Sequence, residues 1–381
     1  MSDFIFKIAP NVLLGKQTVT RLGSLICDKG SRFILILDPA TYEAGCLDKI
    51  TQSMQNSGLD FFTYDELPNN PDSVTLEEVI KLSRGGCIDG VIACGGEKAL
   101  NLGRAVAALY NEKNSVYDYV NGEIPTAKAL PLICIPTSIR DSFLFCDRSA
   151  VIDARSNQIR LLKLQENICD LVIFDGDFSS TLTKNQVAAV ALNILCMTFE
   201  TYLSKKSSFL SDALAEKIFE LMSPDESLTN PIAMNDASDL GILECGCMSS
   251  MTAALSSLGP VTALAWAVHA RYKTSRTLIS AILLPYLIED TLFACDKLVM
   301  AAQRFGVVDR NATATEAAAK LAEEVRSRIA KASLPARLKD LSISIEQLAL
   351  AVNDAVQLEF VQYYSKPINS DTLFNLVKLA Y

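Results

Sequence analysis

The sequence predicts an α/β domain followed by an all-helical domain. Up to about residue 178, short apolar runs typical of buried strands alternate with segments of helical periodicity. From 179 to 381 the helical periodicity continues with almost no strand signal. The chain of 381 residues also exceeds the roughly 250–300 residues that one hydrophobic core usually supports. We therefore expect two domains, 1–178 and 179–381.

The first domain is expected to contain a mostly parallel sheet, because strands and helices alternate along it. A β-hairpin is predicted between 143 and 164, where apolar-polar alternation flanks a turn at 153–157. The predicted strands are 33–38, 60–64, 90–94, 130–136 and 171–175, and the predicted helices are 40–56, 75–83 and 97–111.

In the second domain, 312–331 and 345–364 have the spacing of amphipathic helices. The charge-free stretch 245–270 has the length of a membrane span. It also contains four serines and a Gly259-Pro260 break, which favour buried helices of a soluble domain.

The net charge of −9 argues against nucleic acid or an anionic membrane as a partner. The first sixteen residues lack the charged and apolar regions of a secretory signal. Eleven cysteines show no repeated metal-binding spacing. These features predict a cytoplasmic protein with reduced cysteines.

Several short segments occur in an order and spacing typical of one family. They are 9–15, 37–39, 70–71, 174–177, 281–285 and the ending from 334 to 381. Together they resemble the iron-containing alcohol dehydrogenase family, which includes glycerol dehydrogenase-like and maleylacetate reductase-like members. The resemblance implies an N-terminal α/β dinucleotide-binding (Rossmann-like) domain and an all-α C-terminal domain, the dehydroquinate synthase-like architecture. It also implies NAD or NADP as cofactor, a small-molecule ligand in the interdomain cleft, and a homodimer or higher homo-oligomer.

The family's first cofactor loop, Gly-Gly-Gly-Ser-x-x-Asp-x-x-Lys, holds the dinucleotide pyrophosphate against a helix N-terminus. Here the third glycine is Glu97, which either faces the pyrophosphate and weakens binding or caps the helix and points to solvent. Lys98 could partly offset its charge. Asp38 matches the family aspartate that favours NAD over NADP, although a strand-end Asp before Pro is also common turn chemistry. The residues implied in cofactor binding are Asp38, Gly95, Gly96, Lys98, Asn101, Thr137 and Ser138.

The second loop resembles the family's Pro-Thr-Thr-x-Gly-Thr-Gly-Ser-Glu, which lies beside the nicotinamide. It begins with Pro-Thr-Ser at 136–138, but both glycines are replaced, by Arg140 and Ser142. A backbone that needs positive φ at these positions would be hard to maintain. Arg140 next to Asp141 could also fill the space of the nicotinamide ring. The resemblance therefore implies a weakened cofactor site.

The family's metal ligands are an aspartate and three histidines. The matching positions are Asn193, Met197, Thr262 and Arg276. Amide and hydroxyl oxygens are weak ligands, Met is soft, and Arg repels a divalent cation. We therefore expect no metal. The single histidine, His269, falls on none of these positions and is more typical of a core residue than of a catalyst.

Three functions remain open. One is an NAD(P)-dependent oxidoreductase acting without the usual metal on a small alcohol, an aldehyde or an anionic carbonyl compound. In it Arg276 would stabilise an oxyanion or hold an acidic substrate, and His269 or a tyrosine would be the general base. The alternative is a catalytically inactive homologue that retains the cleft as a small-molecule, nucleotide-binding or structural protein. The third, a lyase or synthase on a dehydroquinate synthase-like scaffold, is less favoured because that group also needs metal-binding histidines.

Overall fold

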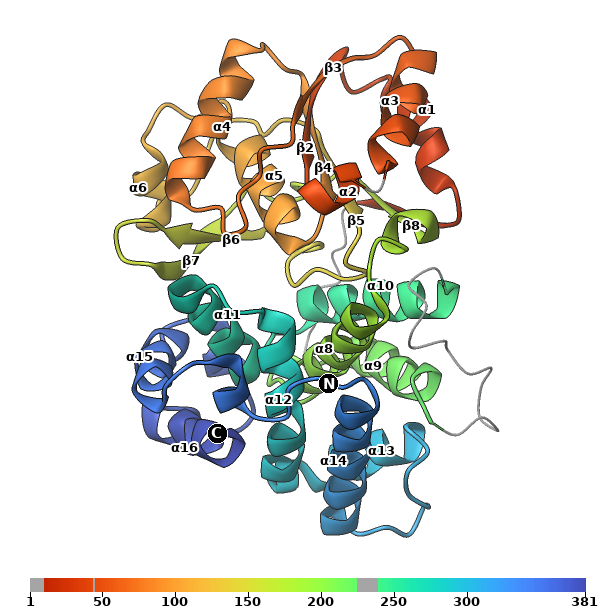
Figure 1. Cartoon of the computed structure of the whole chain (residues 1–381), viewed down its shortest axis with the longest axis vertical. Helices are drawn as coiled ribbons and strands as arrows, with labels where there is room; N and C mark the ends of the chain where they lie inside the picture. The colour runs from red at the N-terminus through yellow and green to blue at the C-terminus, as the bar shows by residue number, and fades with distance from the viewer. Residues whose placement is uncertain (1–9, 44, 225–238) are drawn as a thin grey trace. The chain divides into compact units, whose positions relative to one another are not determined.

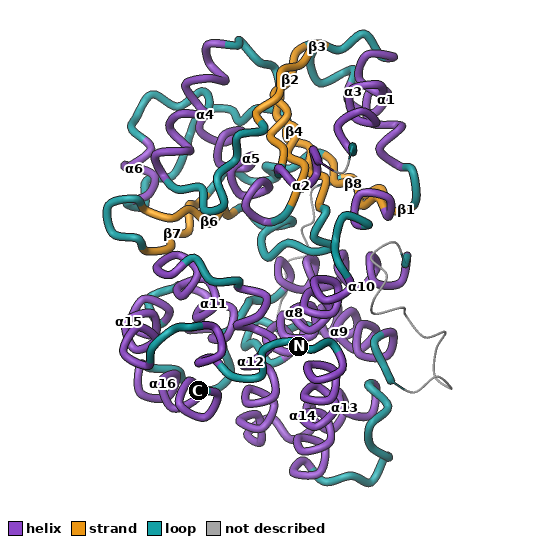
Figure 2. The backbone as a smooth tube through the Cα atoms, viewed as in Figure 1, coloured by secondary structure: helices purple, strands orange, loops and turns teal. Residues whose placement is uncertain are grey.

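The computed structural model describes residues 10–43, 45–224 and 239–381 (Figure 1). The chain divides into two compact units between Leu182 and Thr183, close to the predicted boundary. The first unit combines strands and helices, and the second is helical (Figure 2). This is the fold class that the sequence predicts.

Within the described residues, the first unit contains a six-stranded parallel sheet in the order β1-β8-β5-β4-β2-β3. A separate antiparallel pair forms the predicted hairpin. The strands are β1 (Asn11–Gly15), β2 (Arg32–Leu37), β3 (Asp60–Tyr64), β4 (Gly90–Gly95), β5 (Leu132–Pro136), β6 (Arg148–Asp153), β7 (Gln158–Lys163) and β8 (Leu171–Asp175).

Helices cover both faces of this sheet, with α1 and α3 on one face and α4 and α5 on the other (Figure 1). The helices are α1 (Leu22–Ile26), α2 (Pro39–Glu43), α3 (Cys46–Asn56), α4 (Ser73–Gly85), α5 (Glu97–Leu109), α6 (Val116–Val120) and α7 (Gly176–Ser179). The prediction of one helix over 40–56 was wrong. Gly45 has φ +72°, a left-handed conformation that no helix interior accommodates, so two helices form instead.

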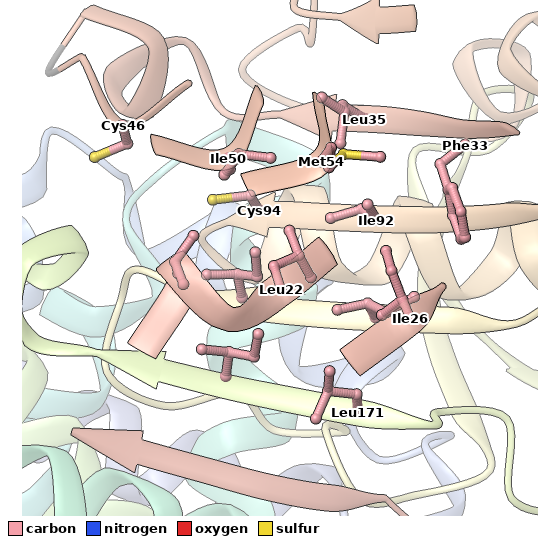
Figure 3. Packing of buried hydrophobic residues seen from close by; sticks show 14 of the residues in the cluster. Leu22, Ile26, Phe33, Leu35, Cys46, Ile50, Met54, Ile92, Cys94 and Leu171 are labelled. Carbon is pink, nitrogen blue, oxygen red and sulfur yellow. The ribbon is translucent and has the colours of Figure 1, made fainter. Parts of the chain in front are cut away.

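Apolar side chains of α1 and α3 pack onto the sheet face that carries alternate residues of β2, β4, β5 and β8 (Figure 3). Leu22 and Met54 come from the helices, and Phe33 and Ile92 from the strands. Each is fully buried, and burial of such a side chain contributes about 1.5–3 kcal/mol. This core fixes the sheet, and the sheet fixes the loops at its carboxyl edge.

The second unit is a helical bundle. The predicted helix 312–331 is present, but 345–364 is not one helix. The helix ends at Ala355, and a 3₁₀ turn at Glu359–Tyr363 follows an extended Leu358, although no Gly or Pro marks the break. The helices are α8 (Lys184–Tyr202), α9 (Phe209–Leu221), α10 (Leu240–Leu255), α11 (Pro260–Tyr272), α12 (Arg276–Glu289), α13 (Cys295–Arg304), α14 (Ala314–Lys331), α15 (Ile345–Ala355) and α16 (Ser370–Ala380).

The charge-free stretch 245–270 forms most of α10 and α11, which bend by 101° at the Gly259-Pro260 break. Among the described residues, 276–304 is the one segment with the length and composition of a single membrane span. Of its most apolar window, 56% is buried inside the protein, which is typical of a core helix.

Candidate functional site

The carboxyl ends of β2, β4 and β5 meet at one edge of the sheet. The Asp38 N–H donates to the Cys94 carbonyl at 3.0 Å, and the Thr137 N–H donates to the Gly95 carbonyl at 3.0 Å. The parallel register therefore brings the strand-end Asp38, the Gly95-Gly96 turn and the Thr137-Ser138 pair side by side. In doubly wound sheets, this edge is where ligands bind.

The Gly95-Gly96 turn has no room for a side chain at Gly95, whereas a Cβ at Gly96 would make only ordinary van der Waals contacts. Gly95 has φ +150°, and a Cβ there would lie 2.6 Å from the Asp38 Cβ and 3.0 Å from the Ala99 Cβ. Gly96 is the N-cap of α5, and a Cβ there would lie 3.7 Å from Asp38 Oδ2 and 3.9 Å from Ser138 Oγ. The bare Gly96 thus leaves room between two polar side chains, beside the first turn of α5. A helix N-terminus with bare backbone suits an anion such as a phosphate.

The carboxylate of Glu97 is turned into the protein. Its Oε1 accepts hydrogen bonds from the Ser142 N–H at 2.8 Å and the Ser142 hydroxyl at 2.6 Å. Its Oε2 lies 3.1 Å from Arg140 Nη1, and both side chains are at most 4% exposed. Both readings of Glu97 from the sequence are therefore wrong. Arg140 and Ser142 provide its charge and hydrogen-bond partners, so the carboxylate neither points to solvent nor obstructs the glycine turn.

A second buried ion pair lies behind the first. Arg104 of α5 pairs with Asp141 through two contacts, Nη1 to Oδ1 at 3.0 Å and Nη2 to Oδ2 at 3.1 Å. Neither side chain is exposed. Burial raises the pKa of the Asp141 carboxyl, the positive charge of Arg104 opposes this, and the nearby Glu97 adds to it. The pair anchors the loop after β5 to α5.

Asn101 belongs to the same buried network. Its Oδ1 accepts from Arg104 Nη2 at 2.9 Å and from the Ala150 N–H at 2.8 Å. Its Nδ2 donates to the Glu97 carbonyl at 2.7 Å. The structure therefore places Asn101 as a link between α5 and the β6-β7 hairpin, and not at the open edge of the glycine turn.

The loop after β5 is strained at one position. Ile139 has φ +70°, and the Arg140 N–H donates to the Ser138 carbonyl at 2.8 Å across it, as in a γ-turn. A β-branched residue in this conformation is rare. The sequence predicts that a positive φ would be hard to maintain at Arg140 and Ser142, and neither residue adopts one. The loop has moved the unusual conformation to Ile139.

Lys98, the second residue of α5, pairs with Asp38 across the glycine turn. The distance from Lys98 Nζ to Asp38 Oδ1 is 3.2 Å, and the side chains are 22% and 15% exposed. Among the residues predicted from sequence, Asp38, Gly95, Gly96, Lys98, Thr137 and Ser138 thus gather at one edge.

The four positions that match the family's metal ligands lie on α8, α11 and α12 of the helical unit. Thr262 donates its hydroxyl hydrogen to Glu200 Oε2 and offers only a neutral hydroxyl oxygen as a ligand atom. The guanidinium of Arg276 stacks 3.6 Å from the centroid of the Trp266 ring. The other two positions present an amide and a thioether, Asn193 and Met197.

This donor set does not suit Fe or Zn, which take imidazole, carboxylate or thiolate ligands. Within residues 10–43, 45–224 and 239–381, no three His, Cys, Asp or Glu side chains gather as a metal site would require. These side chains therefore offer a divalent metal no ligand set of that kind.

Glu200 has a structural role close to these positions. It is fully buried on α8, and its Oε1 accepts from the Val261 N–H at 2.6 Å and the Thr262 N–H at 3.1 Å. It thus caps the N-terminus of α11, where Gly259 leaves it room. Burial raises the pKa of Glu200 to about 7, against the opposing effect of its hydrogen bonds.

His269, Trp266 and Arg276 lie together where α11 leads into α12. His269 Nδ1 is 2.9 Å from the Thr274 carbonyl, which can only accept, so Nδ1 carries the proton. In the neutral tautomer with the proton on Nδ1, Nε2 is the acceptor atom of the ring. The His269 and Trp266 rings meet edge to face at 6.5 Å. The structure thus brings both predicted catalytic residues onto one aromatic ring, a contact that sequence spacing alone does not show.

Comparisons with known proteins match both units. The model "Iron-containing alcohol dehydrogenase" matches residues 9–176, and the model "Fe-containing alcohol dehydrogenase family, C-terminal" matches residues 187–381. NADH-dependent butanol dehydrogenase A of Clostridium acetobutylicum is 25% identical over 401 residues, which cover 100% of both chains. Alcohol dehydrogenase 4 of Saccharomyces cerevisiae is 24% identical over 390 residues, covering 99% of this chain and 98% of the relative.

Solved structures share the fold. A 1,3-propanediol oxidoreductase superposes with a TM-score of 0.91 at 17% identity, covering 100% of each chain. Sulfoacetaldehyde reductase from Bifidobacterium kashiwanohense, solved in complex with NAD+, gives a TM-score of 0.83 at 17% identity, covering 100% of this chain and 99% of the other. Because the family models match nearly the whole of both units, the chain belongs to the iron-containing alcohol dehydrogenase family.

Proposed function

We propose that this protein is a nicotinamide-dinucleotide-dependent oxidoreductase that interconverts a small alcohol and its aldehyde or ketone without a resident divalent metal. The observation that carries the proposal is the Gly95-Gly96 turn at the N-terminus of α5. Its backbone is bare, and the two carboxylates near it each face a cation, Glu97 facing Arg140 and Asp38 facing Lys98. The relatives named above support the reaction class.

The residues that would hold the dinucleotide lie around this turn. Gly95 and Gly96 allow the pyrophosphate to approach the backbone, and the first turn of α5 offers N–H groups that a helix leaves unsatisfied. Asp38 would accept hydrogen bonds from ribose hydroxyls, and Thr137 and Ser138 would contact the phosphate side. When bound, the dinucleotide supplies or accepts the hydride.

On the substrate side, Arg276 and His269 are the groups that we propose. A guanidinium stays charged at any working pH, so Arg276 offers positive charge to an oxyanion or to an acidic substrate but cannot serve as a base. The stack on Trp266 limits the orientations of the guanidinium. With its proton on Nδ1, the neutral His269 ring would present Nε2 as the acceptor atom that a general base requires. An anionic carbonyl compound is therefore the substrate class that these side chains favour.

The proposal is tested by measuring NADH binding and then NADH oxidation with two four-carbon aldehydes, in the presence of EDTA. Butyraldehyde is neutral, and succinic semialdehyde carries a carboxylate. We expect micromolar NADH binding, turnover without added metal, and a preference for the anionic aldehyde. The change R276M should lower kcat/KM for succinic semialdehyde at least tenfold more than for butyraldehyde.

The matched control is R310M, which removes an exposed arginine of the same unit. R310M should leave kcat/KM unchanged for both aldehydes. If the purified protein binds neither nicotinamide cofactor, the oxidoreductase proposal fails, and a catalytically inactive homologue becomes the better description. If NADH binds but R276M lowers kcat/KM equally for both aldehydes, the proposed dinucleotide site is supported and the proposed role of Arg276 is wrong.

A further inference from the structure

The Asp38–Lys98 ion pair has a place in the fold that bears on which dinucleotide the site accepts. Asp38 follows β2, and Lys98 lies in the first turn of α5, which follows β4. The two strands are neighbours, so the pair spans the glycine turn at 3.2 Å. Both side chains are only partly exposed, at 15% and 22%, so their charges interact more strongly than those of a solvated surface pair.

An acidic side chain at the end of the strand beside a glycine turn is the group that accepts hydrogen bonds from the ribose hydroxyls of a dinucleotide. Its negative charge repels a 2′-phosphate, which carries close to two negative charges at neutral pH. Asp38 alone would therefore select the dinucleotide with a free 2′-hydroxyl. Asp38 is not alone here, because an ammonium lies within ion-pair distance of its carboxylate.

Lys98 is also in an unfavourable place for a cation. The N-terminus of a helix carries partial positive charge, so a lysine in the first turn of α5 is destabilised unless an anion faces it. Asp38 Oδ1 is one such anion, but an ammonium has three donors on a flexible stem. Lys98 can therefore hold Asp38 and a ligand phosphate together.

We propose that Lys98 is a specificity-determining residue that neutralises Asp38 and lets the site accept a 2′-phosphorylated dinucleotide, NADP(H), as well as NAD(H). This inference rests on the proposed function, because it presumes that the glycine turn binds a dinucleotide. Asp38 supplies the acceptor that a ribose hydroxyl needs, and Lys98 supplies the cation that a 2′-phosphate needs. With both residues present, the site would bind NAD(H) and NADP(H) instead of selecting one of them.

A competing role for Lys98 is a contact to the pyrophosphate, which NADH and NADPH share. The two roles differ in what the loss of the charge does. A pyrophosphate contact would weaken both cofactors equally, whereas a 2′-phosphate contact would weaken NADPH alone. Comparison of 5′-AMP with 2′,5′-ADP makes the same distinction, because neither contains a pyrophosphate or a nicotinamide.

The experiment measures dissociation constants of NADH and NADPH by fluorescence, and of 5′-AMP and 2′,5′-ADP by calorimetry, on the full chain. K98M keeps the aliphatic stem and removes the charge, D38N removes the opposing carboxylate, and K113M removes an exposed lysine from the turn after α5. We expect the wild type to bind NADH and NADPH within about tenfold of each other. K98M should weaken NADPH and 2′,5′-ADP at least tenfold while changing NADH and 5′-AMP less than threefold.

D38N should shift the preference toward NADPH, and K113M should change none of the four constants. Equal losses for both cofactors in K98M would overturn the proposal in favour of a pyrophosphate contact. Tight NADH binding with no measurable NADPH binding by the wild type would also overturn it, while leaving the proposed function intact. If neither cofactor binds, both the inference and the proposed function fail.

Discussion

The Glu97 carboxylate lies 3.1 Å from the Arg140 guanidinium, and both side chains are buried. Glu97 is the first residue of α5 and Arg140 lies in the loop after β5, and both match positions where the family has glycine. Ser142, the third such position, donates two hydrogen bonds to the same carboxylate. Each replacement alone would place a charge or a polar group in a crowded interior, which is costly. Together they satisfy one another, so the three departures form a single structural change.

The Glu97–Arg140 pair should therefore show strong coupling in a double-mutant cycle. E97Q and R140M each leave one buried charge without its partner, which typically costs about 3–5 kcal/mol. We expect the double variant E97Q/R140M to lose much less than the sum of the single losses, with a coupling of at least about 2 kcal/mol. Urea unfolding followed by circular dichroism measures this.

The matched control for that cycle is the exposed pair Lys49–Asp177, at 2.8 Å. K49M should cost less than about 1 kcal/mol, as exposed ion pairs contribute little. Simple additivity of E97Q and R140M would show that the buried contact contributes nothing to stability.

The arrangement of the sheet edge could be predicted from sequence because it depends on the order of local patterns. Apolar runs predict the strands, parallel strands align their carboxyl ends, and two glycines after a strand predict the turn at Gly95. The direction of a buried side chain is different, because it depends on a partner far along the chain. Glu97 meets Ser142 across 45 residues, so helix periodicity carries no information about that contact.

The helix boundaries that sequence reasoning missed have a similar cause. A single Gly45 in an otherwise helical stretch is compatible with a continuous helix, but its backbone is left-handed here, and α3, which begins after it, packs on the sheet. At Leu358 the chain leaves the helical conformation with no Gly or Pro nearby. Local propensity alone does not predict either break. The Arg276–Trp266 stack is missed for the same reason, since it joins two helices.

Glu200 should make stability fall as the pH rises. Its pKa is about 7 in the folded protein and 4.5 by its ordinary value, so the folded state binds the proton more tightly than the unfolded state. Its contribution is then fully retained below pH 4.5 and declines as the pH rises to about 7. The loss amounts to about 3 kcal/mol. E200Q keeps the shape without the charge and should remove this part of the pH dependence.

The measurement is the unfolding free energy of wild type and E200Q between pH 4.5 and 8. Only the difference between the two curves isolates Glu200, because other carboxyls also titrate in this range. A difference that stays constant over this range would mean that burial does not shift the pKa of Glu200.

Gly259 is required by the Glu200 carboxylate and not by its own backbone angle. Its φ is −130°, which any residue adopts, but a Cβ would lie 2.8 Å from Glu200 Oε1 and 2.9 Å from Cδ. G259A should therefore destabilise the protein by about 1–3 kcal/mol, through overpacking. The thermal midpoints of G259A, E200A and the double variant measure this, and the double variant should be less destabilised than the sum.

A matched control is G85A at the end of α4, where an added Cβ meets no atom within 4 Å. Alanine is the better helix former by up to about 1 kcal/mol, so G85A should be neutral or stabilising. If G259A behaves like G85A, Gly259 does not provide the room for Glu200.

Measurement of the metal content tests whether the helical unit binds a divalent metal. The four positions that match the family's ligands offer an amide, a thioether, a neutral hydroxyl and a cation stacked on Trp266. Protein produced with excess Fe or Zn should therefore contain less than about 0.1 equivalent of either by elemental analysis, and EDTA should leave its thermal midpoint unchanged.

The fourfold variant N193D/M197H/T262H/R276H should bind about one equivalent, because it restores a carboxylate and three imidazoles. Without metal it should be less stable than the wild type, since T262H removes the Thr262 hydrogen bond to Glu200, and added Zn should raise its midpoint. A stoichiometric metal in the wild type that EDTA removes together with stability would contradict this account, because the side chains at 193, 197, 262 and 276 contain no imidazole, carboxylate or thiolate to bind it.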